Sequence, residues 1–320
     1  MRRAPLPLHL TTGSFSLRAS DKAGITRTRT AARDLLTVSR GIRVPAGSGA
    51  AGAAALRAYT DLDDEATLCL GSAGRLWNAP LPGRLEEDWR IHLARRRGLS
   101  TPRRVNVVGH QLALLPDEVV ELDGVRVTSP ARTWLDLASV LSIDELVIAG
   151  DSMVCEHGPE FPHPRNALCS IEELRSIVER HRGSRGVRKA RTAVELIRVG
   201  ADSAPETRLR LVLVRAGLPE PVLNHVVWSE DPWREDAGGG TGLPVLWPDA
   251  AYPQWRISLQ YEGAHHNDED QYLRDIRRAD TAARCGWYEV RISRFDLHGE
   301  HPAAVRKVRN ALEARGRRSS

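Results

Sequence analysis

The sequence predicts an α/β protein built from several domains, and three observations support this fold class. The chain has 320 residues, which at roughly 100–200 residues per domain predicts two or three domains. Apolar residues make up 41% and charged residues 27% of the chain, as in ordinary globular proteins, which argues against a disordered or fibrous chain. Helix-like and strand-like hydrophobic patterns alternate along the chain, most clearly toward its C-terminal end.

Basic residues exceed acidic ones by a small margin. Lys and Arg number 46 against 41 Asp and Glu, for a net charge of +5, and most of the basic residues are arginine. This surplus permits a polyanionic partner without requiring one. No stretch approaches the ~20 apolar residues of a membrane span. Pro5 and Pro7 interrupt an N-terminal stretch that is too short for a signal peptide, so we expect a cytoplasmic protein without membrane contact.

The four cysteines show no spacing typical of a disulfide framework, and we expect reduced thiols. They are Cys69, Cys155, Cys169 and Cys285. A metal site formed by Cys155, His157, His163 and Cys169 is disfavoured, because the segment is loop-like and lacks CxxC or HxxxH spacing.

Residues 13–46 predict a winged helix-turn-helix. Two short helical patterns flank the turn at Gly24–Thr26, and the second covers Arg27–Leu36. The small β element Ser39–Val44 follows, which is the layout of a helix-turn-helix with a wing. We expect its arginines to contact duplex DNA, namely Arg27, Arg29, Arg33 and Arg40.

The Ala/Gly-rich stretch at 46–54 predicts a linker or the start of a helix. Residues 55–153 predict a middle α/β domain. Two β-like runs, Arg104–Val108 and Val119–Val127, precede a helix that starts at Ser129-Pro130 and continues to Leu141. We interpret Arg132 as an ordinary arginine on the face of this helix.

Residues 154–200 predict a helical connector that contains the densest basic cluster of the chain, Arg180–Arg191. Two interpretations stay open. The cluster is either a solvated surface or a sequence-independent contact with phosphates. Its candidate DNA-binding residues are Arg182, Arg185, Arg188 and Lys189.

Residues 201–316 predict a C-terminal α/β domain. A helix opens at Ser203-Ala-Pro-Glu206 and ends before Gly217. The strand Trp255–Tyr261 alternates, with Trp255, Ile257, Leu259 and Tyr261 on one face and Arg256, Ser258, Gln260 and Glu262 on the other. The remaining expected elements are a strand at 222–228, a Gly-rich insertion at 236–242, a helix at 268–284, a strand at 287–292 and a helix to Glu313.

This order of elements, with Pro248-Asp249 followed by Gln260-Tyr261-Glu262, resembles the PD-(D/E)xK restriction-endonuclease fold, a mixed sheet flanked by helices. The closer resemblance is to Vsr-like (very-short-patch-repair-like) endonuclease domains. Further matching positions are Gly263, His266, Asp275, Arg278, Gly286 and Arg291. The preceding residues resemble the AbiEi-type antitoxin arrangement of a winged helix and an α/β domain, a combination typical of actinobacterial proteins. The resemblance covers nearly the whole chain and is specific in the C-terminal domain.

The resemblance implies a metal site for phosphodiester hydrolysis. Asp249 and Glu262 offer hard oxygen ligands for Mg²⁺ or Mn²⁺, with the Tyr261 carbonyl beside them. The second acid of the family is Gln260 here, so the site has lost an anionic ligand and should hold a metal more weakly. His266, or its neighbour His265, would orient water or accept its proton.

Each of these residues also has a simpler interpretation. Glu206 fits a capping box, which we favour over a metal contact. Asp249 fits a turn, and Glu262 fits the end of a strand. Asp275 and Arg278 fit an ordinary pair on the surface of a helix, worth about 0.2–0.5 kcal/mol. The joint occurrence of these residues in the expected order favours the fold more than the activity.

Three hypotheses follow for the function. The first is a Mg²⁺- or Mn²⁺-dependent endonuclease acting on double-stranded DNA, with Glu206 supporting the site and with Arg278 and Arg291 contacting DNA. The alternative is a non-catalytic, antitoxin-like transcriptional regulator with a degenerate nuclease domain, whose partner would be a toxin or another protein. The third, a module that binds RNA or protein, ranks last, because the aromatic content of 5% is low for single-strand stacking.

Overall fold

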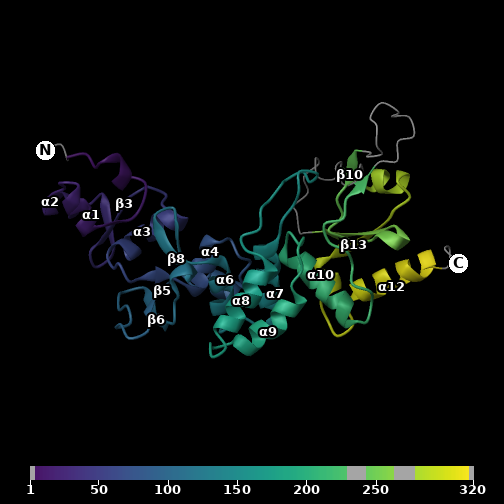
Figure 1. Cartoon of the computed structure of the whole chain (residues 1–320). Coiled ribbons are helices and arrows are strands. Elements are labelled where there is room, and N and C mark those ends of the chain that lie inside the picture. The colour runs from purple at the N-terminus through teal and green to yellow at the C-terminus, as the bar shows by residue number, and fades with distance from the viewer. Residues whose placement is uncertain (1–3, 229–242, 263–277, 317–320) are drawn as a thin grey trace, which may run out of the picture. The chain divides into compact units, whose positions relative to one another are not determined.

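The computed structural model describes residues 4–228, 243–262 and 278–316, and it shows a mixed α/β protein (Figure 1). The chain divides into two compact units. The first unit comprises Met1–Leu146 and Glu172–Arg191, and the second comprises Val147–Ile171 and Thr192–Ser320. The expected connector 154–200 is therefore shared between the two units. In the described part of the chain, no helix combines the length and the apolar character that crossing a membrane requires.

The first unit begins with two short helices and a three-stranded antiparallel sheet of order β1-β3-β2. The elements are η1 (Leu8–Leu10), β1 (Phe15–Ser16), α1 (Leu17–Lys22), α2 (Arg27–Thr30), β2 (Leu35–Ser39) and β3 (Ile42–Pro45). Both helices start at a hydroxyl cap. Ser16 Oγ accepts a hydrogen bond from Ala19 N at 2.9 Å, and Thr26 Oγ1 accepts one from Arg29 N at 3.2 Å.

The helix expected over Arg27–Leu36 is shorter than predicted. It ends at Thr30, and Leu35 opens strand β2 instead. The apolar residues of this segment have helical spacing. Residues 35–39 form a strand instead, because their backbone pairs with β3 across a tight turn at Gly41, whose φ is +81°. The pairing of β2 with β3 therefore decides the structure here, and the helical spacing of the apolar residues does not.

A five-stranded mixed sheet of order β6-β5-β4-β8-β7 follows in the first unit. Its strands are β4 (Thr67–Leu68), β5 (Ile91–Arg96), β6 (Val107–Leu112), β7 (Val119–Leu122) and β8 (Val125–Thr128), and its helices are α3 (Gly52–Asp61), α4 (Leu70–Leu76), α5 (Gly83–Glu86) and α6 (Pro130–Leu137), with η2 (Pro116–Glu118) between β6 and β7. Leu68, Leu93, Val125 and Val127 form the buried core of this sheet together with Tyr59 of α3.

The single run expected over Val119–Val127 is a hairpin of two strands. Asp123 and Gly124 both take positive φ, +49° and +77°, which suits a tight Asp-Gly turn between antiparallel strands. The strand expected from Arg104 begins at Val107, and the helix expected to reach Leu141 ends at Leu137.

The interpretation of Arg132 as an ordinary surface arginine is wrong. Arg132 is 2% exposed. Its guanidinium pairs with Glu118 at 2.6 Å and with Asp136 at 3.0 Å. His181 Nε2 lies 2.6 Å from the other oxygen of Glu118, so this network joins the segment of α8 (Ile171–Arg180) and α9 (Val187–Leu196) to the sheet. Arg132 and Asp136 are four residues apart, a spacing that does not show whether the pair is buried. The burial of Arg132 depends on its contact with Glu118 of η2.

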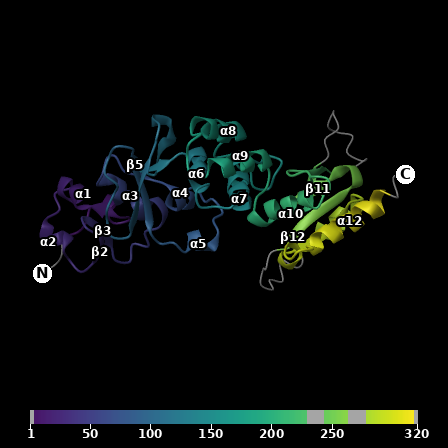
Figure 2. The ribbon, with the colours of Figure 1, turned by 90° about the horizontal axis from the view of Figure 1, so that it is seen from below.

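The second unit contains a three-stranded mixed sheet of order β11-β12-β13 (Figure 2). Strand β12 is antiparallel to β11 and parallel to β13. The elements are α7 (Ile143–Val154), α10 (Ala204–Arg215), β9 (Val227–Trp228), β10 (Pro244–Leu246), β11 (Ala250–Tyr252), η3 (Pro253–Trp255), β12 (Ile257–Glu262), β13 (Tyr288–Ser293), η4 (Arg294–Leu297) and α12 (Ala303–Gly316).

The strand expected from Trp255 begins at Ile257, because Pro253–Trp255 form η3 and Arg256 has a left-handed φ of +51°; from Ile257 on, the predicted faces are confirmed. Ile257 and Leu259 are fully buried, and Trp255 and Tyr261 pack against the same core, to which α10 and α12 contribute leucine, valine and alanine side chains. The expected strand at 222–228 is reduced to β9, preceded by a single bridge between Val222 and Ala251. Because successive side chains of a strand point to opposite faces, Gln260 and Glu262 lie on the face of β12 opposite Ile257 and Leu259.

We predict that Arg132→Met lowers the free energy of unfolding by about 3–5 kcal/mol, because it removes the cation that pairs with buried Asp136 and the nearest guanidinium to buried Glu118. Urea denaturation measures the loss. Arg97→Met, at an exposed position, is the matched control and should change stability by about 0.5 kcal/mol or less. A loss of less than about 1 kcal/mol at Arg132 would contradict the role assigned to the network.

Candidate active site

Asp249 and Gln260 face each other at the end of the β11–β12 pair. The register places Ala250 opposite Leu259, so the preceding residue, Asp249, lies opposite Gln260. Gln260 Nε2 donates to both carboxylate oxygens of Asp249, at 3.0 and 2.9 Å, and the backbone N–H of Tyr261 donates to Oδ2 at 2.6 Å. The expected neighbourhood of these residues is therefore present, and Asp249 is more than a turn residue.

Glu206 lies near this pair, at the start of α10. Ser203 Oγ accepts from Glu206 N at 3.4 Å, and the Glu206 carboxylate accepts from Ser203 Oγ at 2.7 Å and from Asp202 N at 2.8 Å. The Ser203 cap is present as expected, but the Glu206 carboxylate accepts from Asp202 N and Ser203 Oγ rather than from the Ser203 N–H that a capping box requires. The same carboxylate also feels the negative charge of Asp249, so Glu206 combines its structural role with a place in the acidic site.

Burial raises the pKa of both carboxyl groups. Desolvation, followed by repulsion from Asp249, raises the pKa of Glu206 to about 8. Desolvation raises the pKa of Asp249 to about 6, against the opposing effects of the Tyr261 N–H, Arg278 and Gln260. Two neighbouring carboxyl groups with raised pKa values are typical of a functional site, because they attract a proton or a cation.

A buried ion pair holds α10 in place. Arg210, 1% exposed, donates to Asp151 Oδ2 at 2.8 Å, and Thr207 Oγ1 donates to the same oxygen at 2.9 Å. Arg198 N donates to the other oxygen at 2.8 Å. Asp151 belongs to α7, so this network fixes the start of α10, with Asp202 and Glu206, relative to the residues that follow α7.

Glu262 lies at the end of β12, where it is exposed and pairs with Arg291 at 3.2 Å. Arg291 also pairs with Glu289 at 2.8 Å, and Arg278 pairs with the second oxygen of Glu289 at 3.2 Å. A metal bridge between Asp249 and Glu262 stays a prediction. His265, His266 and Asp275 lie outside the described residues, while residues 278–284, which contain Arg278, are helical.

The candidate DNA-binding arginines of the N-terminal segment differ in their surroundings. Arg29 is largely buried, pairing with Asp34 at 2.9 Å and donating to the carbonyl of Ala4 at 2.6 Å, so its role is structural. Arg27 is exposed beside Asp21, while Arg33 and Arg40 are exposed. Arg40 borders a cavity of about 1110 Å³ whose lining also includes Arg95, Arg103 and Arg104. Asp63 also lines this cavity and pairs with Arg95 at 2.6 Å, so Arg40, Arg103 and Arg104 supply its remaining positive charge.

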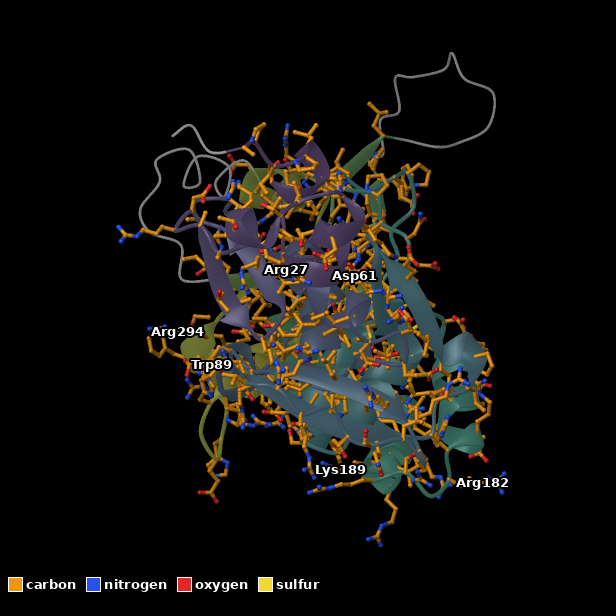
Figure 3. The ribbon with its side chains drawn as sticks, turned by 90° about the vertical axis from the view of Figure 1, so that its left-hand side faces the viewer. Arg27, Asp61, Trp89, Arg182, Lys189 and Arg294 are labelled. Atoms are coloured by element: carbon orange, nitrogen blue, oxygen red, sulfur yellow. The ribbon has the colours of Figure 1, made fainter. Side chains whose placement is uncertain are left out.

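The basic cluster after α8 is solvated at most positions. Arg182 is 73% exposed and projects outward beside Glu179, as Figure 3 shows, and Arg185 and Arg188 are also exposed. Lys189 instead donates to the carbonyl of Leu141, so it helps to hold α9 in place.

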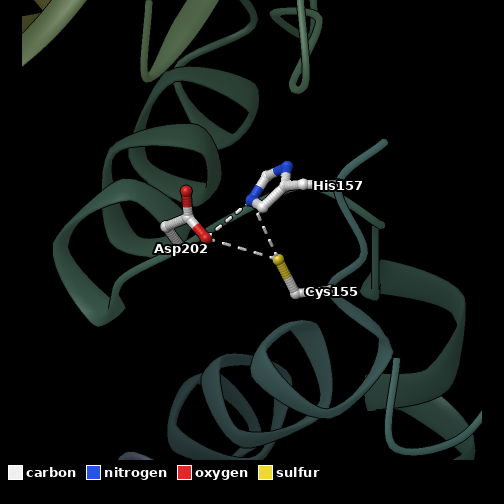
Figure 4. A group of neighbouring side chains, drawn as sticks. All are labelled: Cys155, His157 and Asp202. Carbon is white, nitrogen blue, oxygen red and sulfur yellow. Dashed lines mark hydrogen bonds and ion pairs between the residues drawn. The ribbon is translucent and has the colours of Figure 1, made fainter. Parts of the chain in front are cut away.

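The structure also assembles a group that sequence spacing did not reveal. Cys155, His157 and Asp202 each place one side-chain ligand atom within 4.8 Å of the others (Figure 4). His163 and Cys169 do not belong to this group. Asp202 lies far along the chain from the other two and next to a helix cap, which is the ordinary place for an aspartate. The Cys-x-His pair was the only signal in the sequence.

Comparisons with known proteins identify relatives without a described function. The chain is 26% identical over 249 residues to "Uncharacterized protein Rv2248" of Mycobacterium tuberculosis strain H37Rv. The same identity and length hold for "Uncharacterized protein MT2308" of strain CDC 1551. The match covers 78% of this chain and 82% of each relative. No protein-family model and no solved structure matches the chain.

We predict that Glu206→Gln reduces the loss of stability that occurs between pH 5 and pH 8 in EDTA. The pKa of Glu206 is raised in the folded state, so its protonated form stabilises the fold below the ordinary pKa of 4.5, and this contribution disappears as the pH rises through about 8. Urea midpoints at several pH values measure the effect. Glu172→Gln, at a position 79% exposed, is the control and should keep the wild-type pH profile. Identical profiles for wild type and Glu206→Gln would contradict the assignment.

Proposed function

We propose that the chain is a metal-dependent endonuclease that hydrolyses phosphodiester bonds of DNA. The observation that carries this proposal is the grouping of Glu206, Asp249 and Gln260 at one end of a mixed sheet, with both carboxyl groups buried enough to resist ionisation. Asp249 and Gln260 are two of the positions that carry the resemblance to Vsr-like nucleases, and Glu206 is the residue expected to support the site.

The donor atoms at this place suit a hard divalent cation. Asp249 and Glu206 offer carboxylate oxygens, and Gln260 offers an amide oxygen once its side chain turns over, since the nitrogen and oxygen ends of an amide differ little in shape. Mg²⁺ and Mn²⁺ prefer such oxygen ligands. A cation would also relieve the repulsion that raises both pKa values. Glu206, Asp249 and Gln260 therefore have the side chains that Mg²⁺ or Mn²⁺ requires.

A bound Mg²⁺ would lower the pKa of its water and balance the charge that develops on the phosphate. The protein's own residues have simpler tasks. Asp249 and Glu206 hold the cation, Gln260 orients Asp249, and Glu262 extends the acidic edge of β12 toward Arg291. His266 is the proposed proton acceptor from the attacking water.

The first unit supplies the proposed contacts with duplex DNA. In this proposal the elements α1, α2 and β1–β3 act as a winged helix, with Arg27 and Arg33 toward the DNA. The cavity that includes Arg40, Arg103 and Arg104 offers further positive charge for phosphates. The exposed cluster Arg182, Arg185 and Arg188 is an additional phosphate contact.

A second candidate function rests on the same pair of side chains. The Gln260 amide satisfies both oxygens of Asp249 without any cation, which suits a degenerate nuclease domain in a DNA-binding regulator of the antitoxin type. Such a protein would retain its own promoter DNA without metal and would bind a toxin or another protein. The two candidates differ in their need for metal and in whether DNA is cut.

We predict that the purified protein nicks supercoiled plasmid in Mg²⁺ or Mn²⁺, and that the Glu206→Gln, Asp249→Asn double variant does not. Conversion to open-circular plasmid on a gel measures the activity. Gln260→Glu should bind Mg²⁺ about tenfold more tightly, because charge count sets the affinity of oxygen sites. Calorimetric titration measures this gain. Equal nicking by wild type and the double variant would reject the endonuclease and leave the regulator.

We also predict that the Arg40→Ala, Arg103→Ala double variant binds duplex DNA with a weaker salt dependence. Each lost phosphate contact lowers the slope of log affinity against log salt by about 0.9, so the pair should lower it by about 2. Fluorescence anisotropy at several salt concentrations measures the slope. Arg306→Ala, an exposed arginine of α12, is the control. An unchanged slope in the double variant would remove this cavity from the DNA-binding surface.

A further inference from the structure

Three different ligand atoms meet at one point beside the start of α10. Cys155 Sγ lies 3.5 Å from His157 Nε2 and 3.6 Å from Asp202 Oδ1, and His157 Nε2 lies 2.6 Å from the same Asp202 oxygen (Figure 4). Cys155 and His157 are buried, while Asp202 is 57% exposed at its side chain. The group thus has a buried floor and an opening toward solvent.

The geometry does not suit a cysteine hydrolase. In such an enzyme the thiol and the carboxylate contact different nitrogens of the histidine. One nitrogen accepts the proton of the thiol, and the other donates a hydrogen bond to the carboxylate. Here both contact Nε2, and Nδ1 has no hydrogen-bond partner among the described residues. Burial, followed by the negative charge of Asp202, raises the pKa of the Cys155 thiol to about 12, which disfavours a free thiolate nucleophile.

We propose that Cys155, His157 and Asp202 bind a zinc ion. A sulfur, an imidazole nitrogen and a carboxylate oxygen form the ligand set typical of Zn²⁺ rather than of Mg²⁺. Bonds of about 2.0–2.3 Å in a tetrahedron separate neighbouring ligand atoms by roughly 3.3–3.8 Å. The two distances from sulfur already lie in this range, and the His157–Asp202 hydrogen bond opens when the ion replaces its proton.

The surrounding contacts hold the three ligands close to this arrangement. His157 and Arg165 exchange two backbone hydrogen bonds, at 2.8 and 3.1 Å, which fix the loop after α7. Asn224 Nδ2 donates to the carbonyl of Glu156 at 2.9 Å, between the two ligands of the loop. The hydrogen bond from Asp202 N to Glu206 fixes the third ligand. Little reorganisation is therefore needed to bind the ion.

Three protein ligands leave the fourth position of a tetrahedral zinc open to water. Bound zinc would tie the loop after α7 to the residue that precedes the cap of α10. The three ligand atoms of this site differ from the oxygen ligands of the proposed nuclease site, to which Asp202 is linked only through its N–H donated to Glu206. The proposal does not rest on the nuclease function, because its soft sulfur ligand selects a different class of metal.

Titration of the metal-free full-length chain with Co²⁺, followed by displacement with Zn²⁺, tests the proposal. We expect one tetrahedral Co²⁺ per chain, recognised by its intense visible bands and by a thiolate-to-cobalt charge-transfer band, all removed by Zn²⁺. Cys155→Ser should lose the charge-transfer band, and Asp202→Asn, a change at an exposed side chain, should weaken binding at least tenfold. Cys285→Ser is the matched control and should bind as wild type does.

Circular dichroism in EDTA establishes that each variant is folded. If Cys155→Ser fails to fold, the exposed Asp202→Asn variant decides alone. Absence of the tetrahedral bands in wild type would overturn the proposal. So would a charge-transfer band that survives in Cys155→Ser or disappears in Cys285→Ser, or an affinity unchanged in Asp202→Asn.

Discussion

The buried ion pair between Asp151 and Arg210 is the interaction on which both candidate sites depend. Its carboxylate accepts from Arg210, Thr207 and the backbone of Arg198, so both oxygens of the buried carboxylate are hydrogen-bonded. The pair joins α7 to α10. The residues after α7 supply a thiol and an imidazole, and the residues at the start of α10 supply two carboxylates, so the chemistry of the second unit requires these two helices to keep their relative position.

The sequence was informative where local physics decides the structure. The Ser203 cap, the glutamate three residues later and Gly217 bound α10 to within a residue, because caps act through neighbouring backbone groups. Strict alternation placed Ile257 and Leu259 in the core, and from there the antiparallel partner of Gln260 follows directly. The neighbourhood of Asp249 and Gln260 was predictable for this reason.

The sequence was least informative where partners come from distant parts of the chain. Arg132 looked like a surface residue, since nothing in its own helix shows that Glu118 and His181 enclose it. Nothing in the sequence connected Asp202 with Cys155 and His157, since their meeting needs α7 and α10 to be packed first. A strand replaced part of the helix expected at Arg27–Leu36 because pairing with β3 outweighed the local period. Each case is a long-range contact.

The return of residues 172–191 to the first unit has a consequence for synthesis of the chain. Glu118 is fully buried, and His181, which lies on this returning segment, contacts it. A nascent chain that has emerged only to Leu146 still lacks this partner, so its first unit would be held incomplete until α8 leaves the ribosome. The two units therefore mature as interleaved segments, and a protease cut near residue 160 would leave neither half of the polypeptide with a whole unit.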